Sequence, residues 1–180
     1  RGRDIKRYYY EWAGLWVIFI PWHFPLQNDP TIQGASEKAE NEFKRLYPSI
    51  YLHLLQFKND LSKRNREETG IRYEWYVLQR CAATYYPEFE KEKIVYPNMA
   101  YKLISVYDNE KYYTNQKCFI ITGNNLKYLC ALFNSIIEFW YFKKIGATLG
   151  SNGFEMSKIF IEKIPIPPIT PFNEPIVKQI

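Results

Sequence analysis

The chain has 180 residues, of which 47% are apolar and 18% aromatic, so it is long enough to bury a core without disulfides or a structural metal. Its formal net charge of +5 and its pI near 8.9 favour an anionic partner without requiring one. The three cysteines, none of them in a CxxC pair, argue against a disulfide framework, and we find no signal peptide, so we expect reduced thiols and a cytoplasmic protein.

A basic cluster opens the chain. It consists of Arg1, Arg3, Lys6 and Arg7. We expect this cluster either to bind phosphates or to be a solvated linker, and the missing initiator methionine predicts a fragment of a longer polypeptide. Residues 15–20 predict a buried strand that ends at Pro21, and residues 23–36 predict a loop. The apolar run 12–24 is too short to span a bilayer, so we predict no membrane partner.

Helices are predicted next. A charged helix begins at Ser36 and continues through Phe43. An amphipathic helix follows from about Pro48 to Lys63, because apolar residues recur in it at helical spacing. Residues 63–76 then predict a charged loop that ends in aromatic and basic side chains, which suit base stacking and phosphate binding.

Short strands dominate the prediction for the second half of the chain. They span residues 93–97, 101–107, 112–114 and 118–122, and a helical stretch at 85–92 precedes them. Connections this short are typical of antiparallel hairpins and not of βαβ units.

The most apolar segment is a predicted helix from Leu126 to about Ile145. Two apolar stripes cover more than half of its circumference, so we expect it to cross the core. We expect Asn124 or Asn125 to cap its start and Gly146 its end. Beyond the helix we predict a glycine loop, a short element, an extended proline-rich stretch and a polar tail, at residues 146–153, 156–161, 164–169 and 171–180.

Together these elements predict an α+β fold. It would be a mixed, mostly antiparallel sheet packed on one long apolar helix plus shorter helices. Residues 1–170 are expected to form one domain, followed by the tail at 171–180, and we find no internal repeats.

Catalytic motifs are scarce. The sequence has two histidines and no P-loop, GxGxxG, HExxH or GxSxG motif. The adenine-methyltransferase signature, Asn or Asp before Pro-Pro and an aromatic residue, is also absent, so we expect neither catalysis nor a cofactor in this chain. Asp29, Glu42 and Lys44 fit a metal-dependent nuclease core loosely, and a nuclease is one alternative. A protein-interaction domain with an aromatic docking surface is another.

Six short motifs follow one another in a recognisable order. They are Gly2-Arg3-Asp4-Ile5-Lys6-Arg7-Tyr8; Tyr47-Pro48 with Leu55, Phe57-Lys58, Leu61 and Arg64; Trp75-Tyr76-Val77-Leu78; Lys93-Ile94-Val95-Tyr96-Pro97; Tyr128-Leu129 with Leu132-Phe133-Asn134-Ser135; and Ile164-Pro165-Ile166-Pro167. With these motifs the sequence resembles the C-terminal specificity domain of TaqI-like adenine-specific DNA methyltransferases. The same domain occurs in type IIG restriction–modification enzymes, and the resemblance covers nearly the whole chain.

The resemblance implies a target-recognition domain that holds double-stranded DNA while a methyltransferase domain of the same polypeptide flips the target adenine. That catalytic domain is expected N-terminal to this chain and absent from it. S-adenosylmethionine, and Mg²⁺ where an endonuclease is fused, are expected to belong to the missing domains.

Nine side chains are predicted to contact DNA. They are Lys6, Arg7, Arg64, Arg66, Arg72, Tyr73, Trp75, Lys93 and Tyr113. The basic residues before position 67 would meet phosphates, and Arg72 would grip guanine with two hydrogen bonds. Tyr73 and Trp75 would lie against bases or sugars, and Lys93 and Tyr113 would lie near strand ends of the sheet. The alternative for each residue is a solvated surface position or packing in the core.

Overall fold

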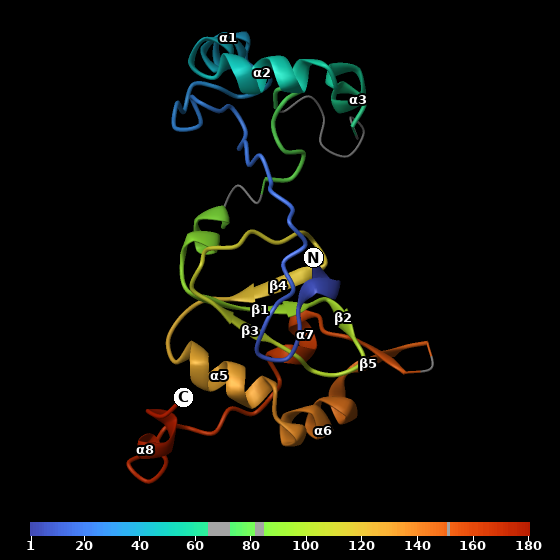
Figure 1. The fold of residues 1–180 in the computed structure, drawn as a ribbon, viewed down its shortest axis with the longest axis vertical. Helices are drawn as coiled ribbons and strands as arrows, with labels where there is room; N and C mark the ends of the chain where they lie inside the picture. Colours follow the sequence, from blue (N-terminus) through green and yellow to red (C-terminus); the bar gives the residue numbers. More distant parts are fainter. Residues whose placement is uncertain (65–72, 82–84, 151) are drawn as a thin grey trace. The chain divides into compact units, whose positions relative to one another are not determined.

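The computed structural model describes residues 1–64, 73–81, 85–150 and 152–180 (Figure 1). The chain divides into two compact units. Unit 1 comprises Arg1–Leu15 and Pro87–Ile180, and unit 2 is the intervening Trp16–Tyr86. The described residues contain helices and two small antiparallel sheets, which confirms the predicted α+β class.

Unit 1 is built around a three-stranded antiparallel sheet. Its central strand is β1 (Lys93–Pro97), and β3 (Val106–Asp108) and β4 (Cys118–Ile121) pair with its two edges. Every residue of β1 is buried, as a central strand covered on both faces requires. Two of the predicted strands, now β1 and β4, are therefore confirmed.

The other two predicted strands differ from the structure. Of residues 101–107, only the last two enter β3. Residues 112–114 form no strand, because the Asp108 carboxylate accepts hydrogen bonds from the backbone N–H groups of Glu110 (2.8 Å) and Tyr112 (3.1 Å). The Asp108 side chain thus occupies the Tyr112 N–H, which a strand would offer to a neighbouring strand.

Successive side chains of β1 point to opposite faces of the sheet. Val95 packs in a cluster with Ile5 of the N-terminal segment. Its neighbour Ile94 packs in a different cluster with Leu126, the first residue of α5 (Leu126–Phe133). The sheet is therefore covered by the N-terminal segment on one face and by α5 on the other (Figure 1).

Two helices occupy the segment that was predicted to be one. The second is α6 (Ile136–Ile145), and a single long apolar helix is not found, so that part of the prediction is wrong. Much of the expected core surface of α6 faces solvent, since Ile136, Ile137 and Trp140 are 81%, 75% and 57% exposed.

Hydrogen bonds at Asn134 and Ser135 account for the break between α5 and α6. The buried Asn134 side chain accepts from the Ser105 N–H (3.0 Å) and donates through Nδ2 to the carbonyls of Ser105 (2.9 Å) and Cys130 (2.8 Å). Ser135 is the N-cap of α6, and its Oγ accepts from the Glu138 N–H (3.1 Å). Ser135 therefore caps the start of a new helix at the point where the apolar periodicity predicted that the first helix would continue.

The predicted caps of this segment also differ. Asn125 is the N-cap residue of α5, but it lies in the left-handed region at φ 55° and its side chain makes no capping hydrogen bond. Gly146 ends α6 in an extended conformation and not in the left-handed one. Glycine is still required there, because a Cβ would lie 2.6 Å from the ring of Phe142.

A second, smaller sheet replaces the predicted glycine loop. It consists of β2 (Met99–Ala100), β6 (Gly153–Glu155) and β5 (Ala147–Leu149), with β6 in the middle and both pairings antiparallel. Gly150 follows β5 at φ 59°, a left-handed conformation that glycine adopts without steric cost.

Short helices complete the described part of unit 1 and its boundary. They are η1 (Gly2–Asp4), η2 (Tyr86–Glu90), α7 (Lys158–Ile161) and α8 (Glu174–Val177). Residues 165–169 form neither helix nor strand, which agrees with the extended proline-rich stretch that was predicted. The predicted polar tail contains α8.

Unit 2 contains three helices among its described residues. They are α1 (Glu37–Leu46), α2 (Pro48–Leu55) and α3 (Lys58–Ser62). The Ser36 Oγ accepts from the Ala39 N–H at 3.2 Å, which confirms the predicted start of α1. The helix predicted from Pro48 to Lys63 is divided between α2 and α3.

The core of unit 2 is aromatic. Phe43 of α1 stacks on Tyr76 with ring centroids 4.5 Å apart and meets Tyr51 of α2 edge to face. The strand predicted at residues 15–20 is wrong, because those residues form no ladder and only Ile20 among them is buried.

Candidate nucleic-acid interface

The basic N-terminal residues of unit 1 form a hairpin. Ile5 and Tyr10 pair as an antiparallel bridge, and the Lys6 N–H donates to the Tyr9 carbonyl at 2.8 Å. Ile5 is buried against the β1–β3–β4 sheet, so the base of the hairpin is fixed to the core. Residues 6–9, which we call the hairpin tip, close the hairpin, and residues 7–9 are exposed.

Tyr8 holds an unusual backbone conformation at the hairpin tip. Its φ of 72° lies in the left-handed region, where a bulky residue is an outlier, and such a residue costs about 1–3 kcal/mol. The Tyr8 N–H donates to the Ser105 carbonyl at 3.0 Å, and the same carbonyl accepts from Asn134 Nδ2. The tip is therefore tied to the polar junction between α5 and α6, which holds the strained residue in place.

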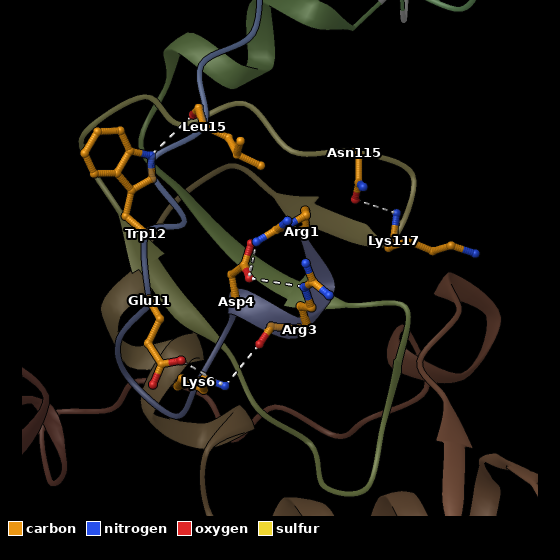
Figure 2. Close-up of polar contacts among 9 residues, drawn as sticks. All are labelled: Arg1, Arg3, Asp4, Lys6, Glu11, Trp12, Leu15, Asn115 and Lys117. Atoms are coloured by element: carbon orange, nitrogen blue, oxygen red, sulfur yellow. Dashed lines mark hydrogen bonds and ion pairs between the residues drawn. The ribbon is translucent and has the colours of Figure 1, made fainter.

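Lys6 and Arg7, the two predicted phosphate contacts at the tip, differ in whether their charged groups are already bound within the protein. Lys6 Nζ lies 3.3 Å from the Glu11 carboxylate and donates to the Arg3 carbonyl at 3.1 Å (Figure 2). Arg7 is exposed, with its guanidinium 5.3 Å from the centroid of the Tyr8 ring. Arg7 can meet a phosphate as it stands, whereas Lys6 must first leave Glu11.

Asp4 neutralises part of the basic cluster. The Arg1 guanidinium donates to both oxygens of the Asp4 carboxylate (2.8 and 3.2 Å), and Arg3 Nε lies 3.8 Å from it (Figure 2). The hydrogen bonds from Arg1 lower the pKa of Asp4, and those to Asp4 raise the pKa of Arg1. The positive charge of the cluster is therefore most available on Arg7, since Arg1 and Arg3 share the Asp4 carboxylate and Lys6 lies at Glu11.

Two tyrosines at the tip were missed by the sequence-based prediction. Tyr8 and Tyr9 are 53% and 55% exposed, whereas Tyr10 packs edge to face on Tyr112 and donates to Glu110 at 2.7 Å. The signal was present as a run of three tyrosines directly after the basic cluster. The local pattern does not show which of the three is held against the body of the unit.

Arg64 of unit 2 acts as a structural link. Its Nη2 donates to the carbonyls of Trp75 and Val77, each at 2.8 Å, and its Nε donates to the Leu61 carbonyl at 3.0 Å. Burial lowers the pKa of its guanidinium. These bonds fasten the segment around Trp75 to α3, so the expectation that Arg64 meets phosphate does not fit this placement.

Tyr73 and Trp75 lie together with Arg64 around one hollow of about 210 Å³. Trp75 Nε1 donates to Glu40 at 2.7 Å, and Lys58 Nζ lies 5.0 Å from the centroid of the tryptophan ring. Three carboxylates also line the hollow, those of Glu37, Glu40 and Glu74. The structure thus brings Arg64, Tyr73 and Trp75 together. Because three carboxylates surround the hollow, it suits an aromatic ring better than a phosphate.

Lys93 does not lie at a surface. Its side chain is fully buried in β1, its Nζ lies 2.6 Å from the Asp108 carboxylate, and it donates to the Phe89 carbonyl at 2.7 Å. Lys93 and Asp108 face each other across the β1–β3 pairing. The expectation that Lys93 contacts DNA is therefore replaced by a role in the core, since removing it would leave a buried carboxylate unpaired.

Of the remaining predicted contacts, Tyr113 is packed, and two arginines lie outside the described residues. Tyr113 stacks on Phe89 with centroids 5.0 Å apart, and its hydroxyl donates to Glu90 at 2.8 Å. Arg66 and Arg72 lie outside the described residues.

The residues of the nuclease alternative have other partners. Asp29 accepts hydrogen bonds from Thr31 and Lys38, which lower its pKa to about 2, and Glu42 pairs with Arg45 at 2.8 Å. Within the described ranges we find no group of three or more His, Cys, Asp or Glu side chains that could hold a metal ion. These positions give the nuclease alternative no structural support.

Two further findings concern the chain as a whole. In the part of the chain that the structure describes, none of the helices combines the length and apolarity needed to cross a membrane. A comparison with curated proteins gives no match.

A comparison with protein families gives one match. The family described as the TaqI-like C-terminal specificity domain matches residues 1–166, a range that holds the hairpin tip, both sheets and the whole of unit 2. Membership implies a DNA-recognition domain of a methyltransferase. With more than nine-tenths of its length matched, the chain belongs to the family of TaqI-like C-terminal specificity domains.

Proposed function

We propose that this chain is the target-recognition domain of an adenine-N6 DNA methyltransferase and reads the sequence of double-stranded DNA. The observation that carries the proposal is the family match over residues 1–166. The exposed arginine and tyrosines of the hairpin tip support it, because they are the side-chain types that contact phosphates and stack on sugars or bases.

The proposed division of labour follows from the physics of base flipping. Extruding an adenine costs stacking and pairing energy, so the duplex must be held by other contacts while the base is out. We assign that holding role to this chain and the transfer of the methyl group to a methyltransferase domain of the same polypeptide. S-adenosylmethionine would bind to that methyltransferase domain, and Mg²⁺ would bind to an endonuclease domain where one is fused. The whole enzyme would act on DNA in the cytoplasm.

We propose fewer DNA contacts than the sequence predicted. Arg7 is the first phosphate contact, and Arg72 is kept as the reader of guanine because of its residue type and its aromatic neighbours. Arg64 and Lys93 are left out, since both are held by contacts within the protein. Lys6, Arg66, Tyr73, Trp75 and Tyr113 are kept as further contacts on the strength of the sequence prediction. On binding DNA, Lys6 would exchange its contact with Glu11, and Trp75 and Tyr113 their hydrogen bonds to Glu40 and Glu90.

Duplex binding by the chain across a salt series tests the proposal. We expect measurable binding in dilute buffer, with log K falling linearly with log salt at a slope of about −0.9 per phosphate neutralised. Repeated selection from a random duplex pool should then converge on a common sequence, while heparin, which has charge but no base pairs, should compete only for the non-specific part. A chain that leaves duplexes unbound in dilute buffer, or whose selected pool stays random, contradicts the proposal.

A further inference from the structure

His23 of unit 2 has a ring nitrogen that the protein does not use. The residue lies in a turn at residues 22–25, and its side chain is 18% exposed. Its Nδ1 lies 3.0 Å from Glu74 Oε1, while Nε2 has no hydrogen-bond partner among the residues that the structure describes. An ionised carboxylate can only accept hydrogen bonds, so Nδ1 carries the proton and donates to Glu74. Nε2 of the neutral ring therefore keeps an unused lone pair.

Glu74 does not need the ring for its own hydrogen bonding. The residue is 2% exposed, and each of its carboxylate oxygens already accepts a backbone N–H. Oε2 accepts from His23 at 2.9 Å, and Oε1 accepts from Ser36 at 3.0 Å. The bond from the ring is a third one, which a residue without a ring would not make. The bond thus fixes the tautomer and the orientation of His23, as a carboxylate does for histidines whose other nitrogen binds a ligand.

The turn around His23 is held by further hydrogen bonds. His23 has a φ of 61°, in the left-handed region that histidine adopts more often than most residues do. The Leu26 N–H donates to the His23 carbonyl at 2.6 Å, and the Tyr76 hydroxyl donates to the Phe24 carbonyl at 2.9 Å. The ring is therefore positioned before a ligand arrives, which lowers the entropy lost on binding.

The turn lies against residues that are proposed to contact DNA. Trp22 stacks on Tyr73 with ring centroids 5.2 Å apart, and both rings pack on the core of unit 2 together with Trp75. Glu74, the partner of His23, stands between Tyr73 and Trp75 in the chain. A base that meets Tyr73 or Trp75 would therefore lie near the turn that carries His23.

We infer that His23 reads a base: its Nε2 accepts a hydrogen bond from the exocyclic amino group of an adenine or a cytosine in the major groove. These amino groups are the donors that base pairs present there, whereas guanine and thymine present acceptors. A lone pair facing an acceptor is repelled, so the contact would discriminate between bases. This inference rests on the proposed function and adds a specificity-determining residue to it.

Deletion of single amino groups from the DNA tests the contact. The duplex sequence selected by the 180-residue chain is remade with purine in place of each adenine, or 2-pyrimidinone in place of each cytosine, one at a time. Since every base pair contains one of these amino groups, all positions are covered. At one position the deletion should weaken binding of the unaltered chain roughly three- to tenfold, and it should leave binding of His23→Asn unchanged. Asparagine tolerates a positive φ and keeps the backbone N–H that bonds to Glu74.

Comparison of the proteins on the same duplexes removes the cost of the lost base-pairing hydrogen bond. His53→Asn alters the other histidine, which lies against Phe57 with ring centroids 5.5 Å apart, and should respond like the unaltered chain. His23→Gly repeats the comparison without a side chain, and urea midpoints check that the variants are folded.

Two results separate the inference from the proposed function. Equal losses in the unaltered chain and in His23→Gly at every adenine and cytosine overturn the inference and leave the proposed function standing. Failure of the unaltered chain to bind any duplex in dilute buffer, or to select a sequence, overturns both.

Discussion

Glu138 is the residue at which burial and hydrogen bonding disagree most clearly. It is 5% exposed, and its Oε2 has no hydrogen-bond partner among the described residues. Its position three residues after Ser135 is that of a capping box, but the Ser135 N–H donates to Leu132 instead, so the reciprocal bond is not made. Burial raises the pKa of Glu138, because a charged carboxylate is poorly solvated there.

A raised carboxyl pKa makes stability depend on pH in a defined direction. The contribution of Glu138 is fully present below its unfolded pKa of about 4.3 and is lost as the pH rises through its folded pKa. Glu138→Gln, which cannot ionise, should therefore match the wild type near pH 4 and exceed it in free energy of unfolding at neutral pH. Urea denaturation across this range checks the prediction, and Glu162→Gln at an exposed position should show no such pH-dependent gain. A constant difference between Glu138→Gln and wild type would show that ionisation is not the cause.

Residue identity alone could predict part of the candidate interface. Four basic residues within the first seven mark the N-terminal segment as a candidate contact. The sequence could not distinguish Lys6 from Arg7, because the ion pair of Lys6 with Glu11 depends on the hairpin. Nor could it place Lys93 in the core, since its partner Asp108 lies on a neighbouring strand.

At the scale of elements, β1 and β4 could be predicted, whereas residues 15–20 and 112–114 form no strand and β2, β5 and β6 were not predicted. β1 and β4 are short apolar runs ended by proline or turn residues, and such local signals survive in the fold. The apolar stripes on either side of Asn134 continue in phase, so periodicity predicted one helix. The break depends on hydrogen bonds to Ser105, a residue 29 positions earlier, which a local pattern does not contain.

Substitution of Asn134 should therefore lower the free energy of unfolding markedly. Asn134→Ala removes the acceptor of the buried Ser105 N–H and the donor to two carbonyls, and leaving such groups unsatisfied costs about 1–3 kcal/mol in unfolding free energy. The exposed Asn124 is the matched control, and Asn124→Ala should change stability by less than about 0.5 kcal/mol. Urea midpoints with unchanged slopes provide the comparison. Equal losses in the two variants would mean that the Asn134 bonds do not stabilise the junction.

At the scale of the whole molecule, the described core clusters are divided between the two units. Three of them draw only on unit 1, and the one around Phe43 draws only on unit 2. Composition and length predict one domain over residues 1–170, and neither reveals that unit 2 interrupts unit 1 within that range. That arrangement appears only when the packing of Ile5 against Val95 is known.

Unit 1 should fold without unit 2, since its clusters are complete without it. We expect a chain in which residues 16–86 are replaced by a flexible glycine–serine linker to unfold cooperatively and to protect the β1 amides from hydrogen exchange. A chain of residues 87–180 alone is the control. It lacks Ile5, whose loss from the core should cost about 2–5 kcal/mol. Rapid exchange throughout β1 in the linker chain would show that unit 1 needs unit 2.

The interrupted path of unit 1 also has a consequence for biosynthesis. During translation, residues 1–15 emerge before the strands on which they pack, because the partners of Ile5 lie at Val95, Val106 and Cys118. Unit 2 is continuous and emerges next, so it can collapse before the strands that pack on residues 1–15 have been synthesised. Translation thus delivers the proposed DNA-contacting residues 6–9 before the sheet on which their hairpin packs, and the nascent chain immobilises them only after β4 has left the exit tunnel.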